Sequence, residues 1–268
     1  MELFEEVFNK ASIYDMLFFN IKAVLEHPTL TDLQEKNPAL YERWKYLSKS
    51  KFDLDMDMEY VGQILPTEEL AQTKYEEKAI YYPEFSRIVA ITYASLYSEE
   101  GKLRRFFKKI NGEDESVVIA TFMDVLHNLS SEGANSTPQF FMDFCGHNIM
   151  GYDIPFLIKR FIKHKDKLQN KQLPYMIKRC LAAKPWESKV IDTVNVWKFN
   201  GSDYTPLMLI VDYLGLKKST DLDTLPEVSR NYWKTVGEKP EEALEYVSLQ
   251  SANQTNLVIQ LMNELRQL

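Results

Sequence analysis

The sequence predicts an α/β fold in which helices lie on both sides of a mixed sheet of about five strands. Three observations indicate this class. Apolar runs of strand length recur between residues 16 and 192. Segments with helical spacing separate these runs and fill most of the remaining chain. Two of the strand-like runs are joined by a short turn, which predicts a hairpin within the sheet.

The first predicted strand is MLFFNIKAV, residues 16–24, and its polar residues are unusual for a buried strand. Successive side chains of a strand point to opposite faces, so Asn20 and Lys22 lie next to each other on one face. Burial of an amide and an ammonium group in a central strand is unfavourable unless both have partners, so a functional or structural role is expected. The alternative is that Lys22 extends to solvent at the end of the strand.

Residues 25–82 differ from their surroundings because they are polar, charged and interrupted by prolines. We interpret them as a mostly helical insertion rather than a separate domain. One helix is expected over residues 38–49 and another over 68–79, with Thr67 as the N-cap of the second. The acidic run at residues 53–59 is interpreted as a solvated loop, with a metal site as the alternative.

A hairpin is predicted next, with strands over residues 86–97 and 102–110 and a turn at 98–101. Its second strand, KLRRFFKKI, is dense in Lys and Arg, and so is the later run IKRFIKHKDK at residues 158–167. We interpret both runs as solvated faces of a strand or helix. A local basic groove is the alternative.

The remaining elements follow from helical spacing, alternation and breaker residues. They are a helix over 114–130, a strand over 139–148, a helix over 153–164, a short strand and then a helix within 189–199, a helix over 205–216 that Gly215 ends, and a long helix over 240–268.

Length, charge and cysteine content restrict the class of protein. The 268 residues are enough to bury a sizeable core, and we predict a single domain over 1–268. A net charge of −7 argues against a protein that coats nucleic acid without specificity. Two cysteines, Cys145 and Cys180, are too few for a disulfide framework or a Cys-rich zinc site. The acidic N-terminus and the lack of an apolar run of membrane-spanning length predict a cytoplasmic protein without a membrane partner.

One motif carries functional information. In FCGHNIMGYDIPFLIKRF, residues 144–161, a strand leads into a His-Asn turn, and Asp153 opens a helix five residues after Asn148. This stretch resembles the second exonuclease motif of the DEDD nucleases, most closely that of the proofreading domains of family-B DNA polymerases. The segments KVIDTVNVWKF and DYTPLMLI and the first strand resemble, in the same order, segments of a bacterial family of predicted 3′–5′ exonucleases. The resemblance implies a ribonuclease H-like fold.

The resemblance also implies a chemistry, which is two-metal phosphodiester hydrolysis with Mg²⁺ or Mn²⁺ held by four carboxylates. The family has an Asp and a Glu on the first strand, and these positions fall on Asn20 and Lys22 here. The Asp of the second motif is kept as Asp153. On the C-terminal helix the family's Tyr is kept as Tyr246, but its Asp falls on Gln250.

A degenerate member of the family is therefore expected, in which metal catalysis is lost. An ammonium group has no acceptor and repels Mg²⁺, and Asp153 alone is a poor metal site. No cofactor is expected, or Mg²⁺ or Mn²⁺ if the protein is active. The predicted partners are single-stranded nucleic acid, bound weakly with Asn148 and His147 as contacts, or a protein. We further expect the Lys22 ammonium to occupy the vacated metal position near Asp153, with Asn20 and Gln250 as hydrogen-bonding neighbours.

Several alternatives remain. Asp15, Glu26 or Glu84 would supply carboxylates in an active 3′–5′ exonuclease with relocated ligands. Asp192 has the character of a metal ligand but, before Thr193, is interpreted as a helix N-cap. His147 is interpreted as a turn histidine, with a catalytic role as the alternative. A third possibility is an unrelated α/β interaction protein in which the match is due to chance.

Overall fold

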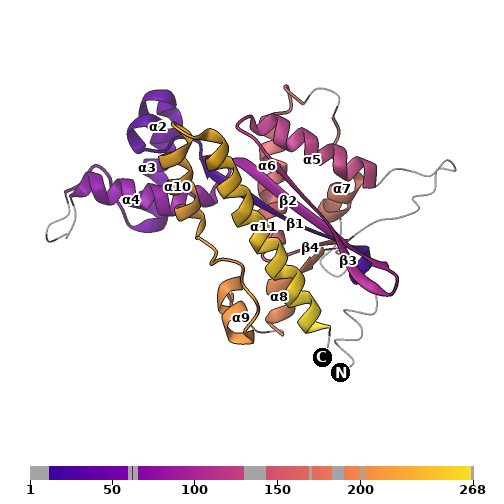
Figure 1. Cartoon of the computed structure of the whole chain (residues 1–268). Helices are drawn as coiled ribbons and strands as arrows, with labels where there is room; N and C mark the ends of the chain where they lie inside the picture. The colour runs from indigo at the N-terminus through magenta and orange to yellow at the C-terminus, as the bar shows by residue number, and fades with distance from the viewer. Residues whose placement is uncertain are drawn as a thin grey trace.

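The computed structural model describes residues 12–59, 62, 66–129, 143–168, 171–182, 190–199, 201 and 203–266. Five strands form one sheet in the order β3-β2-β1-β4-β5 (Figure 1). The strands β1, β2 and β3 are antiparallel neighbours, whereas β4 and β5 run parallel to β1. The predicted α/β class, with a mixed five-stranded sheet flanked by helices, is therefore confirmed. The strand bounds are β1 Met16–Leu25, β2 Ser86–Glu99, β3 Lys102–Asn111, β4 Asp143–Gly146 and β5 Val190–Asp192.

Strand β1 lies in the centre of the sheet, and all ten of its residues are buried. Alternate side chains enter two different cores, as the strand period requires. Phe19 and Ile21 contribute to the core under one face of the sheet. Met16 and Phe18 contribute to the core under the other face.

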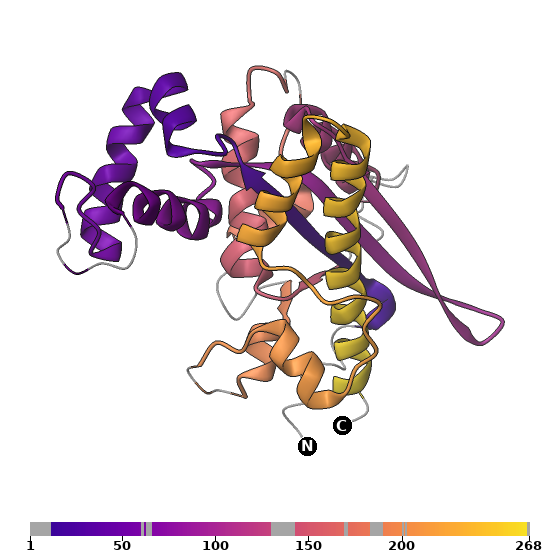
Figure 2. The same ribbon diagram turned by 60° about the vertical axis from the view of Figure 1, so that its left-hand side comes forward.

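Helices cover both faces of the sheet (Figures 1 and 2). The core that contains Phe19 is completed by α5, α6 and α7. The core that contains Phe18 is completed by α9 and α11, and α10 packs beside α11. The bounds are α5 Glu115–Leu129, α6 Ile154–Lys163, α7 Tyr175–Ala182, α9 Leu207–Leu214, α10 Leu225–Val236 and α11 Pro240–Leu265, with the short α8 Thr193–Trp197 after β5 and the 3₁₀ turn η1 Ile13–Asp15 before β1.

The segment between β1 and β2 is helical, as expected for an insertion after the first strand. Figure 2 shows its helices grouped at one side of the sheet. They share a small apolar core built around Trp44, Tyr75 and Phe85, whose rings meet edge to face. The bounds are α2 Leu30–Lys36, α3 Pro38–Phe52, α4 Thr67–Lys78 and the 3₁₀ turn η2 Ala79–Tyr81.

Some local predictions were wrong. Thr67 is the first residue of α4, and Pro66 stands at the N-cap position without a side-chain hydrogen bond. Helices α7 and α10 had no predicted counterpart. A signal for α10 was present, because Thr224 and Glu227 form a capping box at its start.

Other predictions extend beyond the described residues. The strand predicted over 139–148 is described from residue 143 onward, and the helix predicted over 114–130 is described to residue 129. Residue 189 and residues 267–268 also lie outside the described part. In the described part of the chain, none of the helices combines the length and the apolar character needed to cross a membrane.

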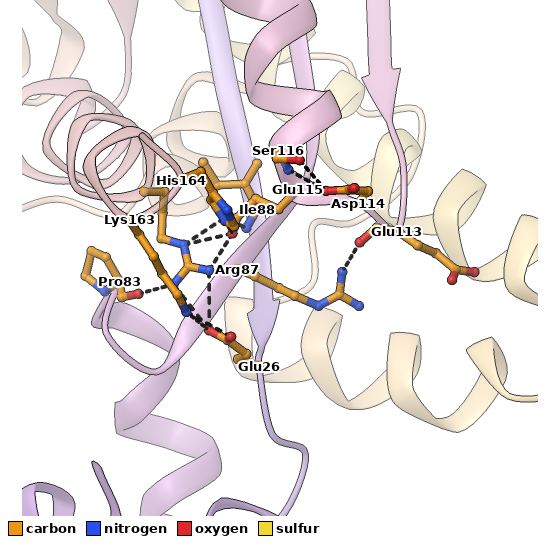
Figure 3. A network of polar contacts seen from close by, with 11 residues as sticks. Glu26, Pro83, Arg87, Ile88, Glu113, Asp114, Glu115, Ser116, Lys163 and His164 are labelled. Atoms are coloured by element: carbon orange, nitrogen blue, oxygen red, sulfur yellow. Dashed lines mark hydrogen bonds and ion pairs between the residues drawn. The ribbon is translucent and has the colours of Figure 1, made fainter. Parts of the chain in front are cut away.

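The second basic run, residues 158–167, is not simply a solvated face. Arg160 is 2 % exposed and forms ion pairs with Glu115 and Glu26. Figure 3 shows these two carboxylates together with Lys163 and His164. Arg160 Nε donates to Glu115 Oε1 at 2.8 Å, and its Nη1 donates to the carbonyl oxygen of Pro83 at 2.7 Å. His164 Nε2 lies 2.6 Å from Glu115 Oε2. Because of the helix period, Arg160 points into the protein while the neighbouring cations of the run face solvent. The buried carboxylate of Glu115 neutralises its charge.

Candidate functional site

A tight turn after β4 places Asp153 beside β1, the central strand of the sheet. Asn148 adopts the left-handed conformation (φ 59°), which Asn tolerates better than most residues. A π-helical turn, Ile149–Asp153, then leads into α6. Two glycines permit this path. A Cβ at Gly146 would lie 2.9 Å from the Ile149 side chain, and one at Gly151 would lie 2.3 Å from Asn148 Oδ1.

Asp192, at the end of β5, holds this turn in place. Its carboxylate accepts the backbone N–H groups of Asn148 at 2.8 Å and Met150 at 3.0 Å. It also accepts the N–H of Val194 at 3.0 Å, so the interpretation of Asp192 as the N-cap of the following helix is confirmed. Burial raises the pKa of Asp192, and the three backbone hydrogen bonds oppose that shift. Its role in the structure is to anchor the turn.

Asp153 is 2 % exposed and is bound by β1. The last β1 residue that pairs with β4 is Phe18, so the backbone beyond it lacks a strand partner on that side. Asp153 Oδ1 accepts the N–H of Ile21 at 2.8 Å and the Nδ2 of Asn20 at 3.1 Å. Ser251, on α11, donates to Asn20 Oδ1 at 3.3 Å. The side chain of Asn20 is therefore held between Asp153 and Ser251.

Lys22 is buried on the same face, with 4 % exposure, and does not extend to solvent. Its Nζ donates to Gln254 Oε1 at 2.5 Å. Among the described side chains, the direct partner of this ammonium is thus an amide rather than Asp153. Asp153 and Asp223 act on it through space.

Burial shifts the pKa of both charged groups toward neutrality. Burial lowers the pKa of Lys22 to about 8, and the carboxylates of Asp153 and Asp223 oppose the shift. Burial raises the pKa of Asp153 to about 7, against the Ile21 hydrogen bond and the Lys22 charge. Near neutral pH the site therefore holds an ammonium ion beside a carboxyl group that is only partly ionised.

The two α11 positions expected at the site lie outside the cavity described below. Tyr246 donates its hydroxyl to Asp223 Oδ2 and accepts from Asn231 Nδ2 at 3.0 Å. Gln250 accepts the backbone N–H of Asp223 at 3.0 Å. Both residues therefore fix the segment that precedes α10. Gln254, one helical turn after Gln250, takes the place expected for Gln250 beside Lys22.

A cavity of about 300 Å³ opens beside these residues. Its volume is at the lower end of the range for small-molecule sites. Two rings at its edge are largely exposed, Tyr81 at 47 % and Tyr204 at 55 %. The ring of Tyr81 lies 6.4 Å from that of Tyr152, and the ring of Tyr204 lies 6.0 Å from that of His147. The lining residues are Asn20, Ile21, Lys22, Tyr81, His147, Asn148, Tyr152, Asp153, Tyr204, Pro206, Leu207, Met208, Leu222, Asp223, Thr224, Leu225 and Gln254.

Two polar groups of the cavity wall are relevant to a ligand. Burial lowers the pKa of His147 to about 4, so its ring is neutral at pH 7, and its Nδ1 lies 2.9 Å from Thr193 Oγ1. The hydroxyl of Tyr152 is buried without a hydrogen-bond partner among the described residues. A buried hydroxyl without a partner costs about 1–3 kcal/mol, so a ligand that pairs with it gains affinity.

The donor set does not suit two divalent cations. The carboxylates that line the cavity are Asp153 and Asp223. Their negative charges interact with the Lys22 ammonium and raise its pKa against the effect of burial. No group of three or more His, Cys, Asp or Glu within the described ranges could hold a metal ion. A buried ammonium offers no lone pair and repels Mg²⁺.

The substitute carboxylates considered from the sequence do not line the cavity. Asp15, Glu26 and Glu84 are absent from its wall, and Glu26 is engaged with Arg160 and Lys163. Sequence reasoning did not identify several residues of the site, among them Asp223, Gln254, Tyr81, Tyr152 and Tyr204. Gln254 had a signal, since it lies on the same helical face as Tyr246 and Gln250.

Comparison of the chain with protein-family models gives no match. Comparison with curated protein sequences gives no match either.

Proposed function

We propose that this chain is a ribonuclease H-like protein of the 3′–5′ exonuclease type that has lost metal-dependent catalysis and binds single-stranded nucleic acid through the cavity. The observation that carries the proposal is the buried Lys22 ammonium on the central strand, which lines the same cavity as the carboxylates of Asp153 and Asp223 and bonds to Gln254. A cation that belongs to the protein takes the place where the resemblance implies metal ions. Fold and binding mode are kept, and hydrolysis is not.

The cavity has features that suit a nucleotide. Tyr81 and Tyr204 present exposed rings on which a base can stack. Asn20, Asn148 and the Tyr152 hydroxyl offer hydrogen-bonding groups, and Leu222 and Leu225 add apolar contact. The volume of about 300 Å³ limits the ligand to a small group rather than a folded segment.

Binding should be weak and sensitive to salt. The chain is net acidic, and the cavity holds two carboxylates, so attraction for phosphate depends on local Lys and Arg side chains. Fluorescence anisotropy with a labelled single strand, titrated at low and moderate salt, measures the affinity and its salt slope. Tight binding that salt does not change would contradict the proposal.

Tyr204→Ala tests the cavity directly. Loss of one stacking ring costs about 1–3 kcal/mol, so we expect the affinity to fall roughly fivefold or more. Tyr46→Ala is the matched control, because Tyr46 is 72 % exposed on α3 and lies outside the cavity. Tyr152→Phe removes one oxygen atom and should weaken binding without loss of stability. Equal affinities for the wild type and the Tyr204→Ala and Tyr152→Phe variants would exclude the cavity as the site.

An active exonuclease with relocated ligands is the second candidate, and Asp223 is the observation that favours it. This carboxylate lines the cavity together with Asp153. Incubation of the protein with a labelled single strand and Mn²⁺ distinguishes the two functions. Degradation that Asp223→Asn abolishes would establish the second function, and an intact strand is expected under the first.

A further inference from the structure

The hairpin formed by β2 and β3 carries a concentration of positive charge in an acidic protein. Figure 2 shows its far end extending beyond the helices that cover the sheet. Residues 95–111 contain five Lys or Arg and two Glu, a net charge of +3 in a chain of net charge −7. Most of β3 is exposed, and β3 is the edge strand of the sheet.

A groove separates this hairpin from the C-terminal half of α11. Its volume is about 630 Å³, about twice that of the cavity at Asp153, and it shares no lining residue with that cavity. The wall contains Arg104, Arg105 and Tyr97 from the hairpin and a row of amides from α11, namely Asn256, Gln260 and Asn263.

Both arginines can bind an anion. Arg104 pairs with Glu99 at 3.2 Å, but both side chains are more than half exposed, so this ion pair contributes little and can exchange for a phosphate. Arg105 donates from Nη1 to Asn256 Oδ1 at 2.5 Å. A guanidinium group has five N–H donors, so this bond orients Arg105 and leaves donors for a ligand.

Aromatic and cationic side chains alternate on one face of the hairpin. Tyr97 and Arg104 are directly opposite each other in the ladder. Phe106 is two residues from Arg104, on the same face and about 7 Å along the strand. Lys108 lies 5.8 Å above the Phe106 ring. Tyr97 and Phe106 are each 45 % exposed, so both rings are accessible to a ligand.

We propose that one face of the hairpin, the hairpin site, binds the bases and phosphates of a single-stranded nucleic acid; it consists of Tyr97, Arg104, Phe106 and Lys108. Arg105 lies on the opposite face, where it bonds to α11. The class of ligand rests on the proposed function, whereas the surface is separate from the cavity. Rings that alternate with cations match a strand in which stackable bases alternate with phosphates. The turn of the hairpin carries Glu99 and Glu100, so it does not suit insertion into an anionic membrane.

The test measures binding of a labelled oligothymidine to the full chain by anisotropy. Tyr97→Ala should weaken binding roughly fivefold or more with the salt slope unchanged. Arg104→Gln with Lys108→Gln should weaken binding and reduce the salt slope by roughly 1.4, about 0.7 for each cation removed. The controls are Tyr46→Ala and the charge-matched pair Lys36→Gln with Lys239→Gln, whose side chains are exposed elsewhere.

The outcomes separate this inference from the proposed function. Weaker binding in both hairpin variants with no effect of Tyr204→Ala supports the hairpin site and overturns the cavity. The reverse pattern overturns the hairpin site and leaves the cavity as the site of binding. A wild-type protein that does not bind the strand overturns both. Displacement of the strand by polyglutamate or by anionic lipid vesicles, at equal charge concentration, overturns the assignment to nucleic acid.

Discussion

Asp153 and Lys22 give the site a dependence on pH whose direction follows from their pKa values. The pKa of Asp153 is raised from 3.8 to about 7, so between these values the folded protein keeps a proton that the unfolded chain has released. The free energy of unfolding therefore falls as pH rises through this window. The pKa of Lys22 is lowered from 10.5 to about 8, so the free energy of unfolding rises with pH between about 8 and 10.5.

Asp153→Asn should remove the first of these effects. The Asn Oδ1 can still accept from Ile21 and Asn20, but the side chain has no proton to release. The step from 3.8 to about 7 corresponds to roughly 4 kcal/mol, so the variant should gain several kcal/mol over the wild type between about pH 4 and pH 7. Urea denaturation at several pH values measures this difference.

The control for this prediction is Asp166→Asn, an exposed carboxylate on the segment after α6. It should change the free energy of unfolding little at any pH in the window. A wild type and an Asp153→Asn variant whose stabilities run parallel with pH would show that Asp153 ionises normally in the folded protein.

At the scale of elements, a buried ion-pair network joins α6 to α5 and to the end of β1 (Figure 3). Arg160 and Glu115 are 2 % and 4 % exposed, respectively. Glu115 also accepts the backbone N–H of Ile88 at 2.6 Å, so the same carboxylate fixes β2. The network fixes the position of α6, which begins directly after Asp153. It therefore helps to hold Asp153 in place.

Arg160→Met should destabilise the protein by about 3–5 kcal/mol, because Glu115 is left buried without its guanidinium partner. The double change with Glu115→Gln should recover part of this loss. Lys159→Met is the matched control one residue away; its ion pair with Glu84 is exposed, so the change should stay within about 1 kcal/mol. Urea denaturation of the wild type, Arg160→Met, Glu115→Gln and the double variant gives the coupling energy. Additive losses for Arg160 and Glu115 would show that the two side chains are not coupled.

At the scale of the whole molecule, the site exists because segments far apart in the sequence converge. Strand β1 supplies Asn20 and Lys22, the turn after β4 supplies Asp153, the segment before α10 supplies Asp223, and α11 supplies Gln254. Lys22 and Gln254 are 232 residues apart. Carboxylates placed at Asn20, Lys22 and Gln254 would therefore lie close enough to Asp153 to share a metal ion.

The triple variant Asn20→Asp, Lys22→Glu and Gln254→Asp should bind Mn²⁺. It replaces the internal cation with carboxylates that face Asp153, and these repel one another until a metal ion neutralises them. Mn²⁺ should therefore raise the Tm of the variant and leave the Tm of the wild type unchanged, as measured by differential scanning calorimetry.

Gln250→Asp in place of Gln254→Asp is the matched control, because Gln250 lies outside the cavity. This control should respond to Mn²⁺ less than the variant with the change at Gln254. A stronger response from the Gln250 version would show that α11 sits one turn away from its position in the structure.

Elements with local signals could be predicted from the amino-acid sequence. Alternation marked β1, the turn at residues 98–101 marked the hairpin, and Gly215 ended α9 in the left-handed conformation. Asp192 was recognised as an N-cap for the same reason, since its partner lies two residues away. Periodicity and capping act between near neighbours, so a single sequence records them.

Which side chains contact one another depends on packing between segments that are distant in the sequence. Tyr246, Gln250 and Gln254 lie on one face of α11. Their spacing predicts that they point in a common direction, but it does not predict which of them lies next to Lys22. The axial position of α11 over the sheet places Gln254 beside Lys22 and leaves Gln250 beside the segment that contains Asp223. That position is set by packing against residues distant in the sequence, and a helix can slide by one turn without any change in its periodicity.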